Sequence, residues 1–181
     1  MTRAIYLGPW RIDLDIRDGI SPPIPDAALA RAIAAALTAA GAPSPASVGL
    51  ILTDDAELAN LNVQHLDTAG PTDVLSFPLL PADAFPEHPG SPARATQAKA
   101  TPDFPLPPGR RTHLGDIVVS VERAIEQAVE GRGGQTGDTH WSPADELRLL
   151  VTHGTLHICG WDHAEPTEEA AMRALERRLL G

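Results

Sequence analysis

The chain has 181 residues, enough for one domain of ordinary size with a core of its own. Its composition, 43% hydrophobic and 21% charged, is typical of a soluble globular protein, and a single cysteine excludes an internal disulfide. A net charge of −10 argues against a broad basic surface for nucleic acid, although a bound metal or a local arginine cluster can still hold a phosphate backbone.

Apolar/polar alternation, short apolar runs and capping residues predict an α+β domain with a small mixed sheet of four strands. The strands are predicted over residues 11–16, 48–52, 73–77 and 117–121. Five helices are predicted to flank them, over residues 27–40, 55–63, 122–130, 143–159 and 167–179. Asp26 is expected to cap the first helix, and Thr53 or Asp54 the second.

We expect the whole chain, residues 1–181, to form this single domain with one insertion. Residues 78–108 hold nine of the eighteen prolines and show no periodicity, which predicts an inserted surface loop at about residues 79–112. No stretch reaches the roughly 18 apolar residues that a membrane span needs, and the amino terminus lacks the apolar core of a signal peptide. We therefore expect a cytoplasmic protein that does not contact membranes.

The helix predicted over residues 143–159 carries the chemistry. Ser142 is suited to its N-cap, Pro143 to its first position and Asp145 to a capping box, while Gly160 can end it in a left-handed conformation. Two histidines, His153 and His157, lie four residues apart and so leave the same face of the helix.

The turn allowed by Gly160 can bring His163 back to the two helical histidines. Three imidazole nitrogens suit one zinc ion, and three protein ligands leave a fourth position open for water, as in catalytic zinc sites. A single histidine on a helix is more often a core or surface residue. Three of the chain's seven histidines within eleven residues are instead predicted to bind one metal ion at the end of the helix.

The same spacing occurs in the HExxHxxGxxH pattern of metzincin proteases, in which the glutamate is the general base. Gly154 stands at the glutamate position, which argues against peptide hydrolysis by that route. Metal-assisted hydrolysis with another base, or with a base from the substrate, remains open. Cys159 is two residues past His157 and is expected to be a buried thiol that points away from the metal.

At this point the sequence resembles a known family. HGTLHICGWDH at residues 153–163 resembles the HGxLHLxGYDH signature of the YbeY family. Residues 71–78 (PTDVLSFP) and 114–120 (LGDIVVS) resemble two further blocks of that family, in the same order. The resemblance implies a zinc-dependent endoribonuclease that cuts single-stranded RNA in 16S ribosomal RNA 3′-end maturation and ribosome quality control. His153, His157 and His163 are the implied ligands of one zinc ion per chain.

The resemblance also implies partners, namely ribosomal RNA and proteins of the small ribosomal subunit. One departure concerns RNA binding, because Leu66 stands where the family has an arginine. Leucine cannot supply the charged fork that binds phosphate. Arg110 and Arg111 are the candidates to replace the family's arginine, with a solvated loop end as the alternative for this pair. Asp73 and Ser76 are candidates to orient the substrate, with a turn cap for Asp73 and pairing in the sheet for Ser76 as the alternatives.

The sequence leaves the catalytic general base unassigned; only a water on the zinc is proposed as the attacking group, and the ribose 2′-hydroxyl is an alternative. Two other functions stay open. One is a different metallohydrolase such as a peptidase, disfavoured by Gly154. The other is a ribosome assembly factor with a structural zinc and little nuclease activity, which Leu66 favours.

Overall fold

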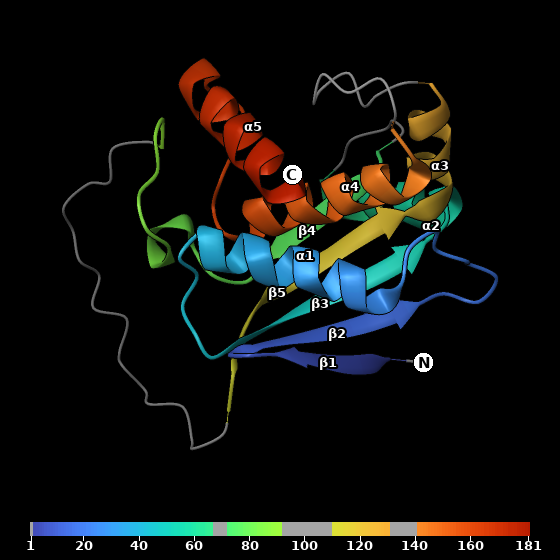
Figure 1. Ribbon diagram of the computed structural model, residues 1–181, viewed down its shortest axis with the longest axis horizontal. Coiled ribbons are helices and arrows are strands. Elements are labelled where there is room, and N and C mark those ends of the chain that lie inside the picture. Colours follow the sequence, from blue (N-terminus) through green and yellow to red (C-terminus); the bar gives the residue numbers. More distant parts are fainter. Residues whose placement is uncertain (1, 67–71, 92–109, 131–140) are drawn as a thin grey trace.

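The computed structural model describes residues 2–66, 72–91, 110–130 and 141–181 (Figure 1). Its strands are β1 Arg3–Leu7, β2 Trp10–Ile16, β3 Ala46–Thr53, β4 Val74–Pro78 and β5 Thr112–Ser120. Its helices are α1 Asp26–Ala39, α2 Asp55–Leu66, α3 Val121–Val129, α4 Pro143–Ile158 and α5 Pro166–Leu180, with a short 3₁₀ helix, η1, at Ala82–Ala84. Residues 92–109 of the predicted insert lie outside the described residues.

The sheet is mixed, with the strand order β1-β2-β3-β5-β4. Strands β2, β3 and β5 run parallel, while the outer strands β1 and β4 pair antiparallel with their neighbours. The predicted α+β class is confirmed, but the predicted number of strands is wrong because β1 adds a fifth. Leu7 pairs with Trp10 across a two-residue turn in which Gly8 has φ +58°, a conformation that tight hairpin turns favour.

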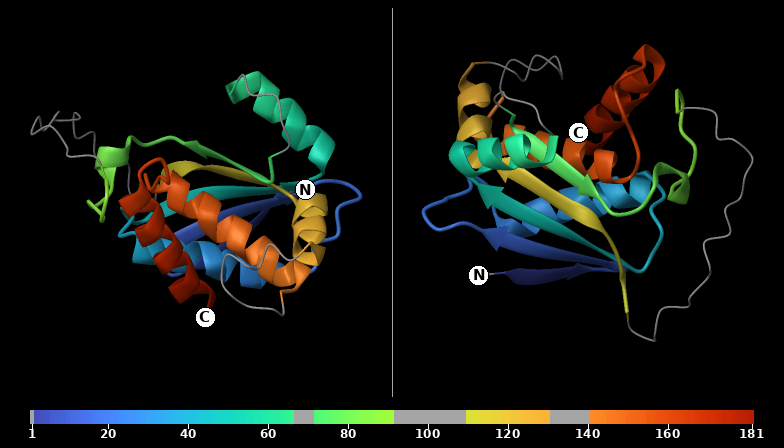
Figure 2. Two further views of the ribbon diagram at one scale, coloured as in Figure 1. Left: turned by 90° about the horizontal axis from the view of Figure 1, so that it is seen from above. Right: turned by 180° about the vertical axis from the view of Figure 1, so that it is seen from behind.

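Helices cover both faces of the sheet unequally. Figure 2 shows α2 on one face and α1, α4 and α5 on the other. The main core lies between the sheet and α1 and α4, where Leu50, Ile117 and Leu156 are fully buried. A second, smaller cluster of Leu58, Leu75 and Val118 lies beneath α2. Helix α4 packs on β4 and β5, so its histidines lie near the β4 edge of the sheet.

The helix ends follow the sequence signals with one exception. Ser142 and Asp145 form the predicted capping box of α4. Asp54 caps α2, since its carboxylate accepts a hydrogen bond from the Glu57 backbone N–H at 2.8 Å. The prediction for α1 is wrong: Pro25 occupies its N-cap, and Asp26 lies in the first turn, where its carboxylate pairs with Arg3. An acidic side chain in the first turn still stabilises the positive end of the helix dipole.

The first part of the predicted insert is packed against the domain. It contains η1 and then Phe85, which is 3% exposed and belongs to the main core. Most residues between 79 and 91 are exposed, and Phe85 is the buried exception that ties this part of the predicted loop to the core. A buried aromatic ring holds the start of the insert in place.

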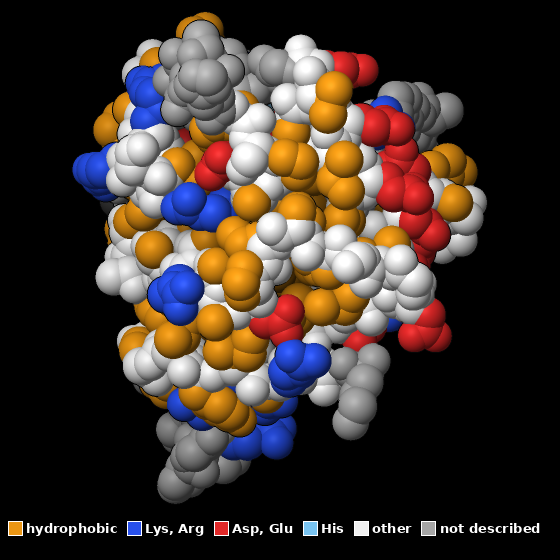
Figure 3. Space-filling view, turned by 45° about the vertical axis from the view of Figure 1, so that its right-hand side comes forward, with side chains coloured by type: hydrophobic (Ala, Val, Ile, Leu, Met, Phe, Trp, Pro, Cys, Tyr) orange, Lys and Arg blue, Asp and Glu red, His pale blue; other side chains and the backbone are white. Residues whose placement is uncertain are grey.

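Charge is unevenly spread over the surface. On the face shown in Figure 3, acidic side chains gather along the right-hand side, while arginines lie on the left and along the lower edge. No broad basic surface is visible on this face, in line with the net charge of −10. In the part of the chain that the structure describes, no helix combines the length and the apolar character that crossing a membrane requires.

Candidate metal centre

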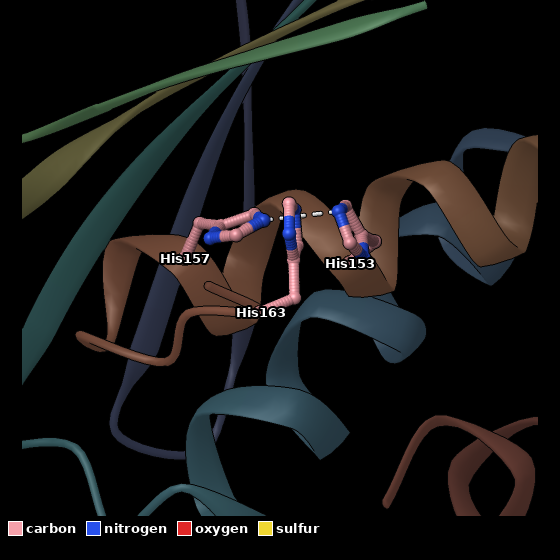
Figure 4. A group of neighbouring side chains, drawn as sticks. All are labelled: His153, His157 and His163. Atoms are coloured by element: carbon pink, nitrogen blue, oxygen red, sulfur yellow. Dashed lines mark hydrogen bonds between the residues drawn. The ribbon is translucent and has the colours of Figure 1, made fainter. Parts of the chain in front are cut away.

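The three predicted histidines lie together at the carboxyl end of α4 (Figure 4). His153 and His157 extend from the helix and are half-buried, and His163 is exposed in the turn between α4 and α5. Their candidate ligand nitrogens all lie within 4.8 Å of one another, and the two Nε2 atoms of His153 and His157 are 2.9 Å apart. The structure thus brings the predicted set to one point.

Local sequence explains this convergence. The chain turns at Gly160, whose φ of +81° is the left-handed conformation predicted for this position. The Gly160 N–H donates to the His157 carbonyl at 3.0 Å, and the Trp161 N–H donates to the Leu156 carbonyl at 3.1 Å. This pair of bonds is a Schellman motif, which ends α4 and reverses the chain. His163 therefore returns to the face that carries the other two histidines.

The second nitrogen of each helical histidine has a partner. His153 Nδ1 lies 2.7 Å from Glu176 Oε1 on α5, and His157 Nδ1 donates to the Trp161 carbonyl at 2.8 Å. These bonds place the N–H on Nδ1 and leave Nε2 free to bind a metal ion. Glu176, which is 6% exposed, was not predicted. The sequence feature that could have indicated Glu176 is its place on the same stripe of α5 as Met172 and Leu175, which face the core.

Electrostatics keep His157 in its neutral form. Burial lowers the pKa of His157 to about 4, and the neighbouring His153 and then His163 act in the same direction. The bond to the Trp161 carbonyl and the charge of Asp162 partly oppose this shift. At neutral pH the His157 ring is therefore uncharged, as metal binding requires. The Asp162 carboxylate accepts a hydrogen bond from the His163 backbone N–H at 2.7 Å and so stabilises the turn.

The donor set fits a small divalent ion. Nitrogens bound to zinc at about 2.0–2.1 Å in a tetrahedron lie roughly 3.3–3.4 Å apart. The observed separations, from 2.9 Å for one pair up to the limit of 4.8 Å, bracket that value. Equal separations require the His153 and His157 rings to move slightly apart and the exposed His163 side chain to adjust. Three histidines can then hold the ion and leave further coordination positions open.

The four residues predicted to contact substrate are dispersed. The Ser76 hydroxyl donates to the Gly154 carbonyl at 3.0 Å and so joins β4 to α4 beside His153. The Asp73 carboxylate accepts from the Gln127 side chain at 3.1 Å. Arg110 is exposed, and the Arg111 guanidinium lies 5.4 Å from the centre of the Tyr6 ring on β1, at the edge of the sheet opposite β4. Their contact with substrate stays a prediction.

Two histidines outside the cluster have partners that sequence spacing did not reveal. His88 Nε2 lies 2.6 Å from Glu168 Oε1, and the ring of His88 stacks on Trp161. His113 lies between the Ser47 hydroxyl at 3.0 Å and the Asp116 carboxylate at 3.1 Å. Neither has its ring in the histidine cluster of α4. The side chain of His65, and all of His140, lie outside the described residues.

A hollow of about 570 Å³ adjoins the turn that carries His163. Its walls are formed by residues between 81 and 91 on one side and between 160 and 168 on the other. Its lining includes the four carboxylates of Asp83, Asp162, Glu165 and Glu168 and no lysine or arginine. Like charges repel, so this hollow is unsuited to a phosphate group.

Gly154 explains why the protease glutamate has no counterpart here. A Cβ atom at this position would point into the sheet, 2.8 Å from Ile117 Cγ2 and 3.1 Å from both Ser76 Oγ and Val74 Cγ2. A glutamate at position 154 would therefore enter the packed contact between α4 and the sheet. We expect Gly154→Ala to lower the free energy of unfolding by about 1–2 kcal/mol, because overpacking outweighs the helix preference of alanine.

Urea denaturation of the Gly154→Ala variant measures this effect. A midpoint that stays the same or rises would show that a methyl group fits between α4 and the sheet.

Cys159 is buried in the core and is 1% exposed, and burial raises the pKa of its thiol to about 12. It is therefore a packed side chain, as predicted, and a poor nucleophile. We expect a thiol reagent to modify less than about 0.1 thiol per native chain, but one thiol per chain in denaturant. Rapid modification of the native protein would contradict the buried position.

Comparison with known proteins gives one consistent result. Residues 23–181 match the family model described as endoribonuclease YbeY. A protein named endoribonuclease YbeY from Kineococcus radiotolerans is 41% identical over 135 residues, which cover 75% of this chain and 63% of that relative. Another protein of the same name, from Symbiobacterium thermophilum, is 37% identical over 144 residues, covering 80% of this chain and 76% of the relative.

The chain spans less than two thirds of the length of several of these relatives, among them the Mycolicibacterium gilvum protein at 62%. The fold also has a solved counterpart. The solution structure of TM1509 from Thermotoga maritima matches with a TM-score of 0.52 and 22% identity, covering 92% of this chain and 86% of that one. This second likeness concerns the fold alone.

Proposed function

The chain belongs to the endoribonuclease YbeY family, and from this membership we propose that it is a zinc-dependent endoribonuclease that cleaves single-stranded RNA. The single observation that carries the proposal is the convergence of His153, His157 and His163. Family membership supplies the substrate class, and the histidine cluster supplies a place where a metal ion can act on it.

The protein's own groups prepare the three histidines for this role. Glu176 and the Trp161 carbonyl engage Nδ1 of the two helical histidines and turn both Nε2 atoms toward the same point. Zinc bound by three imidazoles supplies Lewis acidity at an open position. The exposure of His163 keeps one side of the cluster accessible to a large substrate.

We further propose that the RNA is ribosomal, and that the protein acts in the cytoplasm in 16S ribosomal RNA 3′-end maturation and ribosome quality control. Proteins of the small ribosomal subunit are the proposed partners. Support comes from the family and from the charge of the chain. A net charge of −10 gives little non-specific attraction to RNA, so recognition has to come from particular contacts or from a ribosomal partner.

The contact of position 154 with the sheet weakens the peptidase alternative. The protease mechanism requires a glutamate beside the metal, and in this chain position 154 faces Ile117, Ser76 and Val74. The assembly-factor alternative predicts that zinc binds but RNA is not cut. One cleavage assay distinguishes the proposed nuclease from both the peptidase and the assembly factor.

The assay incubates the zinc-loaded protein with a single-stranded transcript of the 16S 3′ region, with the same sequence as a duplex, and with an unstructured peptide. We expect cleavage of the single strand and little cleavage of the duplex or the peptide. The ends of the products identify the attacking group, because attack by the ribose 2′-hydroxyl leaves a cyclic phosphate. A protein with one zinc per chain that leaves the single strand intact would refute nuclease activity and favour the assembly factor.

A further inference from the structure

The described start of the insert, residues 82–91, packs directly against the turn that carries the third histidine. Two glycines permit this approach, one on each segment. A Cβ atom on Gly160 would lie 3.0 Å from Ala82, and a Cβ atom on Gly90 would lie 2.4 Å from the backbone nitrogen of Glu168. The two segments are therefore in backbone contact at both ends of their interface.

His88 lies at the centre of this interface. Its side chain is 5% exposed, its Nε2 lies 2.6 Å from Glu168 Oε1, and its ring stacks on Trp161 at a centroid distance of 4.0 Å and an angle of 11°. The same oxygen of Glu168 accepts the Asp162 backbone N–H at 3.0 Å. One buried carboxylate oxygen thus joins the insert to the residue before His163. Hydrogen bonds to a buried charged group are among the stronger ones in proteins.

Both contacts of His88 lead to the histidine cluster, one through Trp161 and the other through Glu168 and Asp162. Trp161, on which its ring stacks, provides the carbonyl that orients His157. Asp162, which shares the Glu168 oxygen with it, accepts the backbone N–H of His163. His163 is exposed, so its position depends on the conformation of this turn. A fixed turn lowers the conformational entropy that is lost when His163 binds a metal ion.

We propose that His88 is a positioning residue of the metal centre: through Glu168 and Trp161 it holds the 161–163 turn in the conformation that presents His163. The start of the insert is then part of the machinery that retains the metal. This inference rests on the proposal that the three histidines bind zinc. It goes further by assigning a role to a residue more than 60 positions away from the cluster in the sequence.

Two variants separate the contributions of the bond and the ring. His88→Gln keeps an N–H donor for Glu168 and removes the stacked ring, whereas His88→Phe keeps an aromatic ring on Trp161 and removes the donor. His113→Phe is the matched control, because His113 also pairs with a carboxylate, Asp116, but on β5 and outside the histidine cluster. Each protein is examined as the full chain.

Zinc affinity is measured by competition with a chromophoric chelator, and the visible spectrum of the cobalt-substituted protein reports ligand geometry. Loss of a group bonded directly to a metal ligand typically lowers metal affinity 10–100-fold. His88 acts one contact further out, so we expect a loss of about tenfold for His88→Phe, affinity within about threefold of wild type for His88→Gln, and no loss for His113→Phe. The cobalt spectrum of His88→Phe is expected to change. Urea unfolding of the metal-free proteins records stability separately.

Three results would overturn the proposal. The first is His88→Phe with wild-type zinc affinity and cobalt spectrum, even if its metal-free form unfolds more easily, since that pattern describes a purely structural residue. The second is an equal loss of affinity in His113→Phe. The third is wild-type protein that binds no zinc, which would refute the metal centre itself and is therefore distinguishable from failure of His88 alone.

Discussion

Substitution of His157 by alanine is expected to lower zinc affinity by more than about 100-fold and to abolish RNA cleavage. This loss exceeds the 10–100-fold typical of an outer partner because a direct ligand is removed. His157 is the histidine on which the arrangement depends most closely. Its Nε2 lies 2.9 Å from that of His153, and its Nδ1 is bonded to the chain of the turn that carries His163. Two imidazoles cannot hold zinc with comparable strength.

Zinc content after dialysis, together with the cleavage rate on a single-stranded transcript, measures both parts of this prediction. His113→Ala is the control, since it removes a half-exposed histidine from a hydrogen-bonded pair on β5. Cleavage by His157→Ala at the wild-type rate would point to a contaminating nuclease or to a centre elsewhere in the chain.

The second large effect is expected at Glu176. Glu176→Gln keeps the shape of the side chain but removes the charge that holds the N–H of His153 on Nδ1. Because an amide can also donate to Nδ1 and favour the wrong tautomer, we expect zinc affinity to fall about 10–100-fold. Cleavage is then weak at limiting zinc and recovers when zinc is in excess. A purely structural role for Glu176 would not give this recovery.

A zinc titration of the cleavage rate checks the prediction, with Glu169→Gln as the matched control on the same helix. Glu169 is paired with Arg173 on the surface of α5, so its substitution should leave the titration unchanged. Identical titration curves for Glu176→Gln and wild type would contradict the role assigned to Glu176.

The features of the metal centre that the sequence could predict are those that depend on residues close together in the chain. The four-residue spacing of His153 and His157 depends only on helix geometry, and the helix itself follows from the capping box at Ser142 and Asp145. Gly160 ends the helix in the predicted left-handed conformation, and the Schellman bonds return His163 to the same face. Each step acts within a few residues, so neighbouring sequence determines it.

The parts that could not be predicted depend on tertiary contacts. Glu176 reaches His153 across 23 positions, and Glu168 meets His88 across 80. Spacing along the chain carries no information on such pairs; only an acidic residue on a core-facing stripe hints at them. The fifth strand was missed for a related reason, because β1 is mostly exposed and alternates weakly. Phe85 likewise enters the core from a proline-rich segment without periodicity.

The residues predicted to contact substrate also show that nearness in the sequence does not determine tertiary contacts. Ser76 on β4 packs against α4, and its hydroxyl donates a hydrogen bond to the Gly154 carbonyl. This bond connects β4 to α4. Arg111 lies over Tyr6 near the opposite edge of the sheet. The proximity of Arg111 to the LGDIVVS block in the sequence therefore does not translate into proximity to the histidines.

We propose that RNA cleavage requires one metal ion bound by His153, His157 and His163. The most direct measurement removes bound metal with a chelator and then titrates the stripped protein with zinc while the cleavage of a single-stranded transcript is recorded. We expect no cleavage by the stripped chain and a rate that rises linearly to a plateau at about one zinc per chain. Full cleavage by the stripped chain would contradict this proposal.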